Sequence, residues 1–319
     1  MRTTVIGVLA AFVGGLGGAA QSRVNGALAG SLHNGIAAAL VSNLTALTLV
    51  TVAMVAAPAA RAGLRLALGR LRQGTLRPWE FLGGACGALY VASQGVSAGV
   101  LGLAVFTVAV VAGQTGGGLA VDRAGIAPGG RRPVTRLRAL GAAVTVAAVA
   151  VAVSGRLHAG TALALAVLPL LAGMALAVQG AVNGRVQRAA GAVLPAVFIN
   201  ALVGTVALVL AFAVAVAARG WPDGALPAQP WLYLGGVIGV GFTAIGVAVV
   251  RRIGVLLLGL AVIAGQLTGA LVLDLAVPGP AGAPGLAGFV GVGLTLVAVL
   301  IVLADRSVRP ARLRKVTGA

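Results

Sequence analysis

Charged residues are scarce in this chain of 319 residues. They make up 9% of the sequence, against 60% hydrophobic residues, and the mean hydropathy is +1.08. A soluble protein of this length needs far more charge on its surface. Because lipid offers no hydrogen-bond partners, only helical bundles and closed barrels satisfy the backbone inside a membrane. Long apolar runs favour helices over the short alternating segments of a barrel, so the sequence predicts an all-α polytopic membrane protein.

Residues that build enzyme or metal centres are also few. The single cysteine, Cys86, excludes a disulfide or a thiolate metal cluster within one chain. The two histidines, His33 and His158, are isolated, with no carboxylate or cysteine near them in the sequence. The sequence has no phosphate loop and no G-x-S-x-G or H-E-x-x-H motif. We therefore expect no metal, no cofactor and no catalytic residue.

Aromatic residues make up only 4% of the chain, and no acidic residue lies near the middle of a predicted helix. Glu80 stands at the start of one, beside Trp79. Transporters that exchange protons for bulky cations typically hold a buried carboxylate, often caged by aromatic side chains. The sequence therefore disfavours that class of transporter.

Ten apolar runs are predicted to cross a bilayer, which takes about 20 residues for a helix. They lie near residues 4–20, 36–57, 81–97, 100–121, 140–154, 161–178, 193–218, 231–250, 254–277 and 285–304. Several are short, so these helices are expected to extend into polar flanks such as "QSRVN". The first run resembles a signal peptide, but related residues recur inside the chain, where no secretion signal can stand.

The formal net charge of +18 comes from arginines in loops between the apolar runs, so membrane topology explains it and no nucleic-acid partner is expected. If the N-terminus is cytoplasmic, 20 of the 23 basic residues fall on the cytoplasmic side. The other three are Arg23, Arg156 and Arg219. The positive-inside rule then predicts a multi-pass protein of the bacterial cytoplasmic membrane with both termini cytoplasmic. The basic loops and C-terminal tail are expected to lie on anionic inner-leaflet lipid, or simply to anchor the topology.

The chain repeats itself. Three segments of the first half recur in the second. At an offset of 158 residues, the segment "AAQSRVNGAL" (19–28) matches "AVQGAVNGRV" (177–186). At an offset of 152 residues, the segment "RPWEFLGGACG" (77–87) matches "QPWLYLGGVIG" (229–239), and "AGQTGGGLAVD" (112–122) matches "AGQLTGALVLD" (264–274). Each half holds five predicted helices, and an odd number makes the second half enter the membrane from the opposite side. The sequence thus predicts two inverted-topology five-helix repeats, 1–156 and 157–319, in one transmembrane domain, an arrangement typical of secondary transporters.

These motifs, in order and twice, resemble the drug/metabolite transporter superfamily, and in particular its YdcZ-like branch. Members of that branch are often single five-helix proteins that would pair head to tail, and this chain resembles two such units fused. The motif of the second helix is only partly preserved in the first copy, where "SNLTAL" (42–47) aligns with "NALVGT" (200–205). The resemblance implies membrane transport of a small molecule, with export as the direction, and names no substrate. A homodimer stays open.

Pairs of amide side chains spaced by four residues recur in the two halves. With the polar residue that follows each pair, they are Gln21, Asn25 and Ser42 in the first half and Gln179, Asn183 and Asn200 in the second. This spacing puts each pair on one helix face. Because amides offer both donors and acceptors, the two faces are predicted to bind a neutral polar or zwitterionic solute. Arg23 is expected either to reach the outer interface or to attract an anionic substrate.

Gln114 and Gln266 occupy equivalent places, each between glycines four residues apart. A glutamine in a membrane needs a partner in protein or in a water-filled cavity. Small residues at this spacing let backbones approach, so the helices near 100–121 and 254–277 are expected to pack together with the glutamines as hydrogen-bond partners. The alternative is that Gln114 and Gln266 bind substrate, and both interpretations stay open.

Asp122 and Asp274 end those two helices, about 12 Å from the glutamines at 1.5 Å per residue. Asp122 is adjacent to Arg123, which predicts a helix-end ion pair or cap; a role in ion coupling is the alternative. Taken together, the sequence predicts a secondary transporter that moves a small polar metabolite or drug-like solute by alternating access. The rival classes are a membrane enzyme, disfavoured by the missing catalytic groups, a non-transporting scaffold or accessory subunit, and a channel.

Overall fold

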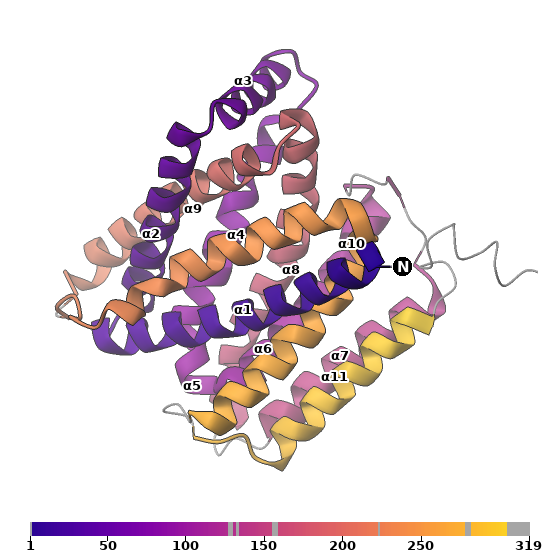
Figure 1. Ribbon diagram of the computed structural model, residues 1–319. Coiled ribbons are helices and arrows are strands. Elements are labelled where there is room, and N and C mark those ends of the chain that lie inside the picture. Colours follow the sequence, from indigo (N-terminus) through magenta and orange to yellow (C-terminus); the bar gives the residue numbers. More distant parts are fainter. Residues whose placement is uncertain are drawn as a thin grey trace, which may run out of the picture.

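The computed structural model describes residues 2–126, 130–131, 134–154, 159–222, 224–277 and 282–304, and they are almost wholly helical (Figure 1). The helices of the first half are α1 (Arg2–Leu32), α2 (Gly35–Ala56), α3 (Pro58–Arg72), η1 (Pro78–Leu82), α4 (Gly83–Ser93), η2 (Gln94–Ala98), α5 (Gly99–Leu101), α6 (Leu103–Ala124) and α7 (Arg136–Ser154). Those of the second half are α8 (Ala159–Ala190), α9 (Val193–Arg219), η3 (Pro230–Tyr233), α10 (Leu234–Ala276) and α11 (Leu286–Ala304). The predicted repeat boundary at 156/157, His158 and the C-terminal tail lie outside the described residues.

The described helices fit a polytopic membrane protein. Six segments are long and apolar enough to cross a bilayer: Val5–Leu32, Gly35–Ala56, Pro78–Leu101, Leu103–Ala124, Ala164–Ala190 and Val193–Arg219. Each overlaps one predicted span. The other four predicted spans fall on α7, α10 and α11, where the described apolar stretches include the shorter Pro230–Gly246, Ala261–Ala276 and Leu286–Ile301. The all-α prediction is confirmed for the described residues, and the count of ten spans stays a prediction.

Helix α10 departs from the prediction, which placed a break between residues 250 and 254. Helical hydrogen bonding continues through this stretch, so that α10 has 43 residues. A straight helix of that length would extend about 65 Å. Instead the ribbon folds back sharply near its middle (Figure 1). Both arms meet α1, because Gly14 faces Ile245 and the neighbouring Gly15 faces Val262.

Helix α3 was predicted as a loop and is an amphipathic helix. Ala60, Gly63 and Ala67 form its buried face. A Cβ at Gly63 would lie 2.8 Å from the carbonyl oxygen of Ala190, so a small residue is needed where α3 crosses the end of α8. The arginines, which determined the prediction of a loop, occupy the opposite, exposed face.

The two halves pack on each other in the same way through glycine. A Cβ at Gly113 of α6 would clash with the carbonyl oxygen of Leu170 on α8, and one at Gly265 of α10 would clash with that of Phe12 on α1. Phe12 and Leu170 are themselves separated by the repeat offset of 158 residues. The expectation that these glycines join the fourth helices of the two halves is therefore wrong. Each joins a fourth helix to the first helix of the opposite half, and at the α10–α1 crossing Gly265 meets Gly15 directly.

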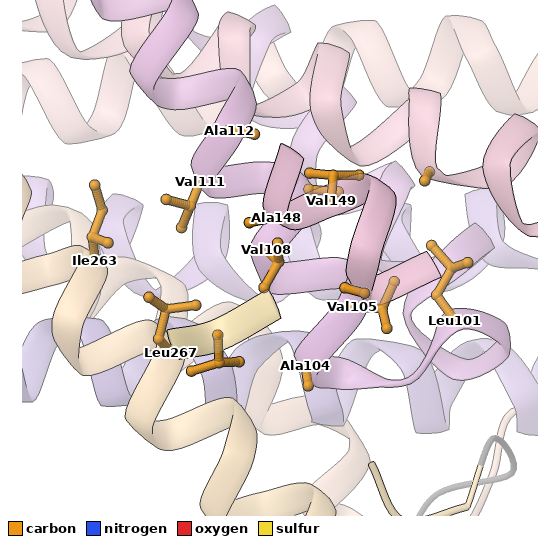
Figure 2. Packing of buried hydrophobic residues seen from close by; sticks show 14 of the residues in the cluster. Leu101, Ala104, Val105, Val108, Val111, Ala112, Ala148, Val149, Ile263 and Leu267 are labelled. Carbon is orange, nitrogen blue, oxygen red and sulfur yellow. The ribbon is translucent and has the colours of Figure 1, made fainter. Parts of the chain in front are cut away.

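An apolar core lies where α6, α7, α10 and α11 meet. Val108 and Ala112 of α6, Ala148 of α7 and Leu267 of α10 are members of one buried cluster (Figure 2). All of the labelled side chains are alanine, valine, isoleucine or leucine. This core holds α6 and the second arm of α10 in place beside α1 and α8, which carry the polar residues described next.

Candidate functional site

The second-half amides form a closed cluster between α8, α9 and α4. The side-chain nitrogens of Gln179 and Asn183 both donate to Oδ1 of Asn200, each at 2.9 Å. A Cβ at Gly83 would lie 2.5 Å from Oδ1 of Asn183, and one at Gly87 would lie 2.9 Å from Nε2 of Gln179. The two glycines of the P-W-x-x-x-G-G motif therefore make room for the amides. Oε1 of Gln179 is buried without a hydrogen-bond partner.

The first-half amides lie between α1, α2 and the first arm of α10, and they are arranged differently. Nδ2 of Asn25 donates to Oε1 of Gln94 at 2.6 Å, whereas Oδ1 of Asn25 and Oγ of Ser42 are buried without partners. Both unpartnered atoms face Gly235, and Gln21 faces the glycine one turn further along α10. The six predicted amide-cluster residues are thus brought together as two sets of three, one in each half.

A chain of hydrogen bonds continues from the first-half cluster toward α4. Nε2 of Gln94 donates to Oγ of Ser22 at 2.8 Å, and that hydroxyl donates to the carbonyl oxygen of Gly18 at 3.0 Å. Oγ of Ser22 also lies 3.4 Å from the hydroxyl of Tyr90. Gln94 opens the single π-helical turn η2. Such turns in α-helices are found frequently at functional sites, because they re-aim side chains.

This chain of hydrogen bonds ends at a narrow pocket, which we call the Gln266 pocket. The pocket lies between α1, α4, α6 and the second arm of α10. Its polar lining consists of Ser22, Tyr90, Thr107 and Gln266, and its apolar lining includes Ala19, Phe106 and Val110. Gln266 is only 2% exposed, and its Oε1 has no partner. A buried, unpartnered amide atom costs about 1–3 kcal/mol, so a ligand that satisfies it gains that amount.

The equivalent place in the second half lacks these groups. At the repeat offsets, the first-half residues Gly18, Ser22, Tyr90, Gln94 and Thr107 correspond to Leu176, Gly180, Phe242, Gly246 and Gly259. Gln114, the counterpart of Gln266, is partly exposed on α6 rather than buried. The two halves share a backbone framework, but only the first carries this set of hydroxyl and amide groups.

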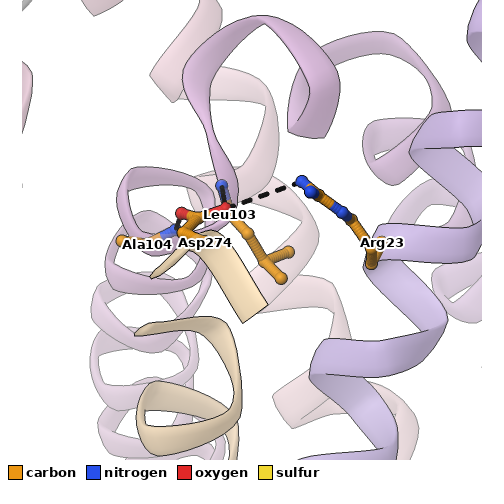
Figure 3. Close-up of polar contacts among 4 residues, drawn as sticks. All are labelled: Arg23, Leu103, Ala104 and Asp274. Atoms are coloured by element: carbon orange, nitrogen blue, oxygen red, sulfur yellow. Dashed lines mark hydrogen bonds and ion pairs between the residues drawn. The ribbon is translucent and has the colours of Figure 1, made fainter. Parts of the chain in front are cut away.

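Asp274 holds three elements together at one end of the bundle (Figure 3). Its carboxylate accepts hydrogen bonds from the backbone N–H groups of Leu103 at 3.3 Å and Ala104 at 2.8 Å, the first residues of α6. Arg23 of α1 lies 3.7 Å from the same carboxylate, which is 1% exposed. A negative charge at a helix N-terminus is favourable, because the orphan N–H groups and the helix dipole both point toward it. Asp274 therefore joins α10 to α6 and α1.

Two further ion pairs lie on α6 and η1. Asp122 pairs with Arg138 of α7, not with its sequence neighbour Arg123. Glu80 pairs with Arg185 of α8 and accepts from the backbone N–H of Arg77 at 2.8 Å. The Glu80 carboxylate is 2% exposed, so it lies inside the protein. The first pair lies within the first half, and the second joins the two halves.

Ser22, Tyr90, Gln94, Thr107 and the Glu80–Arg185 pair were not among the predicted site residues. They do not recur in the second half, and repetition was the criterion that selected the predicted residues. A usable indication did exist, since polar side chains inside apolar runs are rare and need a partner whether or not they repeat.

Comparison with known proteins places this architecture in a family. A family model described as "Putative inner membrane exporter, YdcZ" matches residues 6–151 and 164–306, one match in each half. A solved crystal structure shares the fold, with a TM-score of 0.52 and 15% sequence identity over 100% of this chain and 99% of that one. No curated protein matches the chain. The matched segments cover nearly all of the sequence, so the chain belongs to the YdcZ family of the drug/metabolite transporter superfamily, as two family units fused in one polypeptide.

Proposed function

We propose that the chain is a secondary transporter that moves a small polar solute outward across the cytoplasmic membrane by alternating access. Membership of an exporter family supports a transporter rather than an enzyme. The observation that carries the proposal is a set of four buried atoms without partners, Asn25 Oδ1, Ser42 Oγ, Gln179 Oε1 and Gln266 Oε1. A scaffold gains nothing from unsatisfied polar atoms in lipid surroundings, whereas a transporter needs groups that exchange partners with its solute.

The contacts between the halves support alternating access. Gly113 and Gly265 sit at close crossings with α8 and α1, where a Cβ would meet backbone atoms of the opposite half. Two ion pairs join the halves, Arg23–Asp274 and Arg185–Glu80. The predicted topology places Arg23 outside and Arg185 in the cytoplasm, so one pair would close each side. Rocking of one half on the other would then open one pair while the other holds.

This proposal retains the predicted topology. The two repeats, 1–156 and 157–319, would cross the membrane in opposite directions, with both termini cytoplasmic. The two arms of α10 would count as two spans, because each meets α1 and the ribbon reverses between them (Figure 1). The ten spans would then comprise α1, α2, the η1–α5 segment, α6, α7, α8, α9, both arms of α10 and α11.

Metabolite profiling of the culture medium tests the transport function. Cells that overexpress the intact chain are compared with cells expressing the Gln21→Ala/Gln179→Ala double variant at equal membrane abundance. The control is Gln229→Ala, whose side chain is exposed before η3 and makes no cap hydrogen bond. We expect one or a few polar solutes to accumulate in the medium with the intact chain and the control, and not with the double variant. Identical media for all three would reject transport and favour the scaffold alternative.

A further inference from the structure

The two halves differ most at the Gln266 pocket, and we propose that the transported solute binds there as a compact neutral molecule that carries hydrogen-bonding groups. This inference rests on the proposed transport function and adds to it the place of binding and the class of substrate. It differs from the sequence-based expectation, in which the two repeated amide faces bind the solute.

The first step is the state of the polar groups in the pocket. Gln266 lines the pocket, and its amide oxygen is buried without a hydrogen-bond partner. Thr107 and Tyr90 add hydroxyls to the same lining. These groups converge from α10, α6 and α4, which belong to both halves. A solute held by them would sense the relative position of the halves, as a transported molecule must.

The second step is the orientation of Tyr90. The only proton of the Ser22 hydroxyl goes to the carbonyl oxygen of Gly18, and the same oxygen accepts from Gln94. The 3.4 Å contact between Ser22 and Tyr90 therefore has the Tyr90 hydroxyl as donor. The Tyr90 hydroxyl also hydrogen-bonds with Gln94, so Ser22 and Gln94 together hold it at the edge of the pocket. Asn25 donates a hydrogen bond to Gln94 and so fixes the other end of this chain of hydrogen bonds.

The third step is charge. The lining of the Gln266 pocket contains no charged side chain. Arg23, which follows Ser22 in α1, forms an ion pair with Asp274. A charged solute would have to leave water for a site without a counter-charge, which is strongly unfavourable. Phe106 and Val110 provide an apolar wall. The pocket therefore suits a neutral solute with a hydrogen-bonding end and an apolar or planar body.

The fourth step is the comparison with the second half. There the amides of Gln179 and Asn183 bond to Asn200, which closes the cluster on itself. The hydroxyls that line the Gln266 pocket are replaced by Phe242 and Gly259 at the repeat offset. The second-half cluster therefore leaves one atom, Oε1 of Gln179, without a partner, whereas the hydroxyl groups of the Gln266 pocket come from the first half alone.

The pocket is too small to hold a water molecule in this state, so a solute can enter only when the surrounding helices separate. Entry must therefore be visible as reactivity of a residue that is buried in the closed state. Thr107, which is 4% exposed, is such a residue.

Transport kinetics provide the first test, with the solute identified by profiling as substrate. Tyr90→Phe removes one hydroxyl, and Tyr233→Phe is its matched control, because that hydroxyl donates to Pro227 in a loop. Gln266→Leu is matched in the same way by Gln229→Leu on the exposed surface. Losing one hydrogen bond of about 1.4 kcal/mol corresponds to a tenfold weaker affinity for the solute. We expect KM to rise about tenfold in the two pocket variants and to change less than twofold in the two controls. Unchanged KM in both pocket variants, with transport intact, would overturn the proposal and leave the transport function standing.

Cysteine labelling provides a second test that does not require a known substrate. Thr107→Cys is made in a Cys86→Ser background, and Thr145→Cys, equally buried but on α7 away from the pocket, is the control. Membrane vesicles are treated with neutral methyl methanethiosulfonate or with its anionic sulfonatoethyl and cationic trimethylammonium-ethyl analogues. In each case the cysteine thiolate attacks the reagent's sulfenyl sulfur and releases methanesulfinate.

We expect Thr107→Cys to react at least tenfold faster with the neutral reagent than with either charged one, and Thr145→Cys to stay unmodified. An inert Thr107→Cys, or equal rates with a charged reagent, would overturn the proposal. Vesicles that move no solute while Thr107→Cys shows the expected selectivity would instead reject the transport function and retain a neutral-ligand pocket.

Discussion

Asp274 and its repeat counterpart Asp122 have different surroundings despite their equivalent places in the sequence. Asp274 is 1% exposed and bonds to two backbone N–H groups as well as Arg23, while Asp122 is 19% exposed in its pair with Arg138. A carboxylate that satisfies the start of a helix stabilises it by about 0.5–2 kcal/mol. The same residue type in the same motif therefore contributes unequally to the stability of the fold.

Replacing Asp274 by alanine is expected to lower the melting temperature of the detergent-solubilised protein more than replacing Asp122 does. The loss for Asp274→Ala should be about 1–3 kcal/mol, because two N–H groups of α6 and the Arg23 guanidinium lose their acceptor together. Asp122→Ala leaves Arg138 partly solvated and should cost about 1 kcal/mol or less. Thermal unfolding followed by intrinsic fluorescence measures both. Equal shifts would mean that the capping bonds of Asp274 contribute nothing.

Individual residues were predictable from the sequence where both halves preserve them. Gln21, Asn25 and Ser42 were selected because they have counterparts, and the structure does bring them together. Tyr90 and Gln94 were missed, since nothing in the second half matches them. The partner of Asp122 was also missed, because an ion pair across a loop of uncertain path cannot be read from adjacency. Repetition reports what the two halves share, whereas binding groups that serve one solute need not be shared.

Helix crossings depend on single glycines, and this dependence can be measured. Gly113→Ala and Gly265→Ala each place a methyl group against the backbone of the first helix of the opposite half. Overpacking of this kind costs about 1–3 kcal/mol, because the helices must move apart. Gly116→Ala on the same helix is the control, since its Cβ meets nothing within 4 Å and alanine is the better helix former. We expect the first two variants to lower the melting temperature and the control to leave it unchanged or raise it. A loss in Gly116→Ala of equal size would assign the effect to the helix itself.

Helix α3 is expected to lie on anionic lipid at the cytoplasmic surface. Arg65 and Arg72 are exposed on it, opposite its buried face. Each basic residue near an anionic surface contributes about 1 kcal/mol of attraction. A dye attached to Ala62→Cys in the Cys86→Ser background should show a more apolar environment in phosphatidylglycerol nanodiscs than in phosphatidylcholine nanodiscs. Arg65→Glu/Arg72→Glu should abolish that difference, and Arg219→Glu, predicted to lie outside, should keep it. A dye that reports the same environment in both lipids would leave α3 a topology anchor only.

The sequence predicted the apolar helices better than their ends and connections. Apolar runs identify α2, α6 and α9 because burial in lipid requires them. Helix α3 was missed because a search for apolar runs passes over a helix that is polar on one face. The break in α10 was predicted at a pair of arginines, Arg251 and Arg252; helical hydrogen bonding continues there, although the ribbon reverses near the middle of α10 (Figure 1). Elements are thus predictable where hydropathy decides them, and less so where backbone geometry does.

The arrangement of the whole molecule follows from the repeats more than from any single motif. Two glycine crossings related by the repeat offsets join α1 to α10 and α8 to α6. The repeats alone did not predict which helices would meet, because small-residue faces on four helices allow several pairings. The observed one is selected by the apolar core that holds α6, α7, α10 and α11 together.

Alternating access requires that the two ion pairs between the halves open in turn, and reversible cross-links can test this. In the Cys86→Ser background, Arg23→Cys/Asp274→Cys would lock one side and Glu80→Cys/Arg185→Cys the other when joined by a bis-methanethiosulfonate reagent, which forms one disulfide with each cysteine and spans a longer gap than a direct disulfide. We expect cross-linking of either double variant to abolish solute export and dithiothreitol to restore it, because each lock forbids one of the two open states. Arg138→Cys/Asp122→Cys, whose residues pair within one half, is the control and should export when cross-linked.

Accessibility then assigns the sides of the membrane. With the second lock closed, the protein can open only outward, so Thr107→Cys added to that variant should react with neutral reagent from outside the cell. With the first lock closed it should react only in inside-out vesicles. Export that continues with both inter-half locks closed would show that the halves do not need to rock, and the protein would have to conduct as a channel through a path that neither ion pair closes.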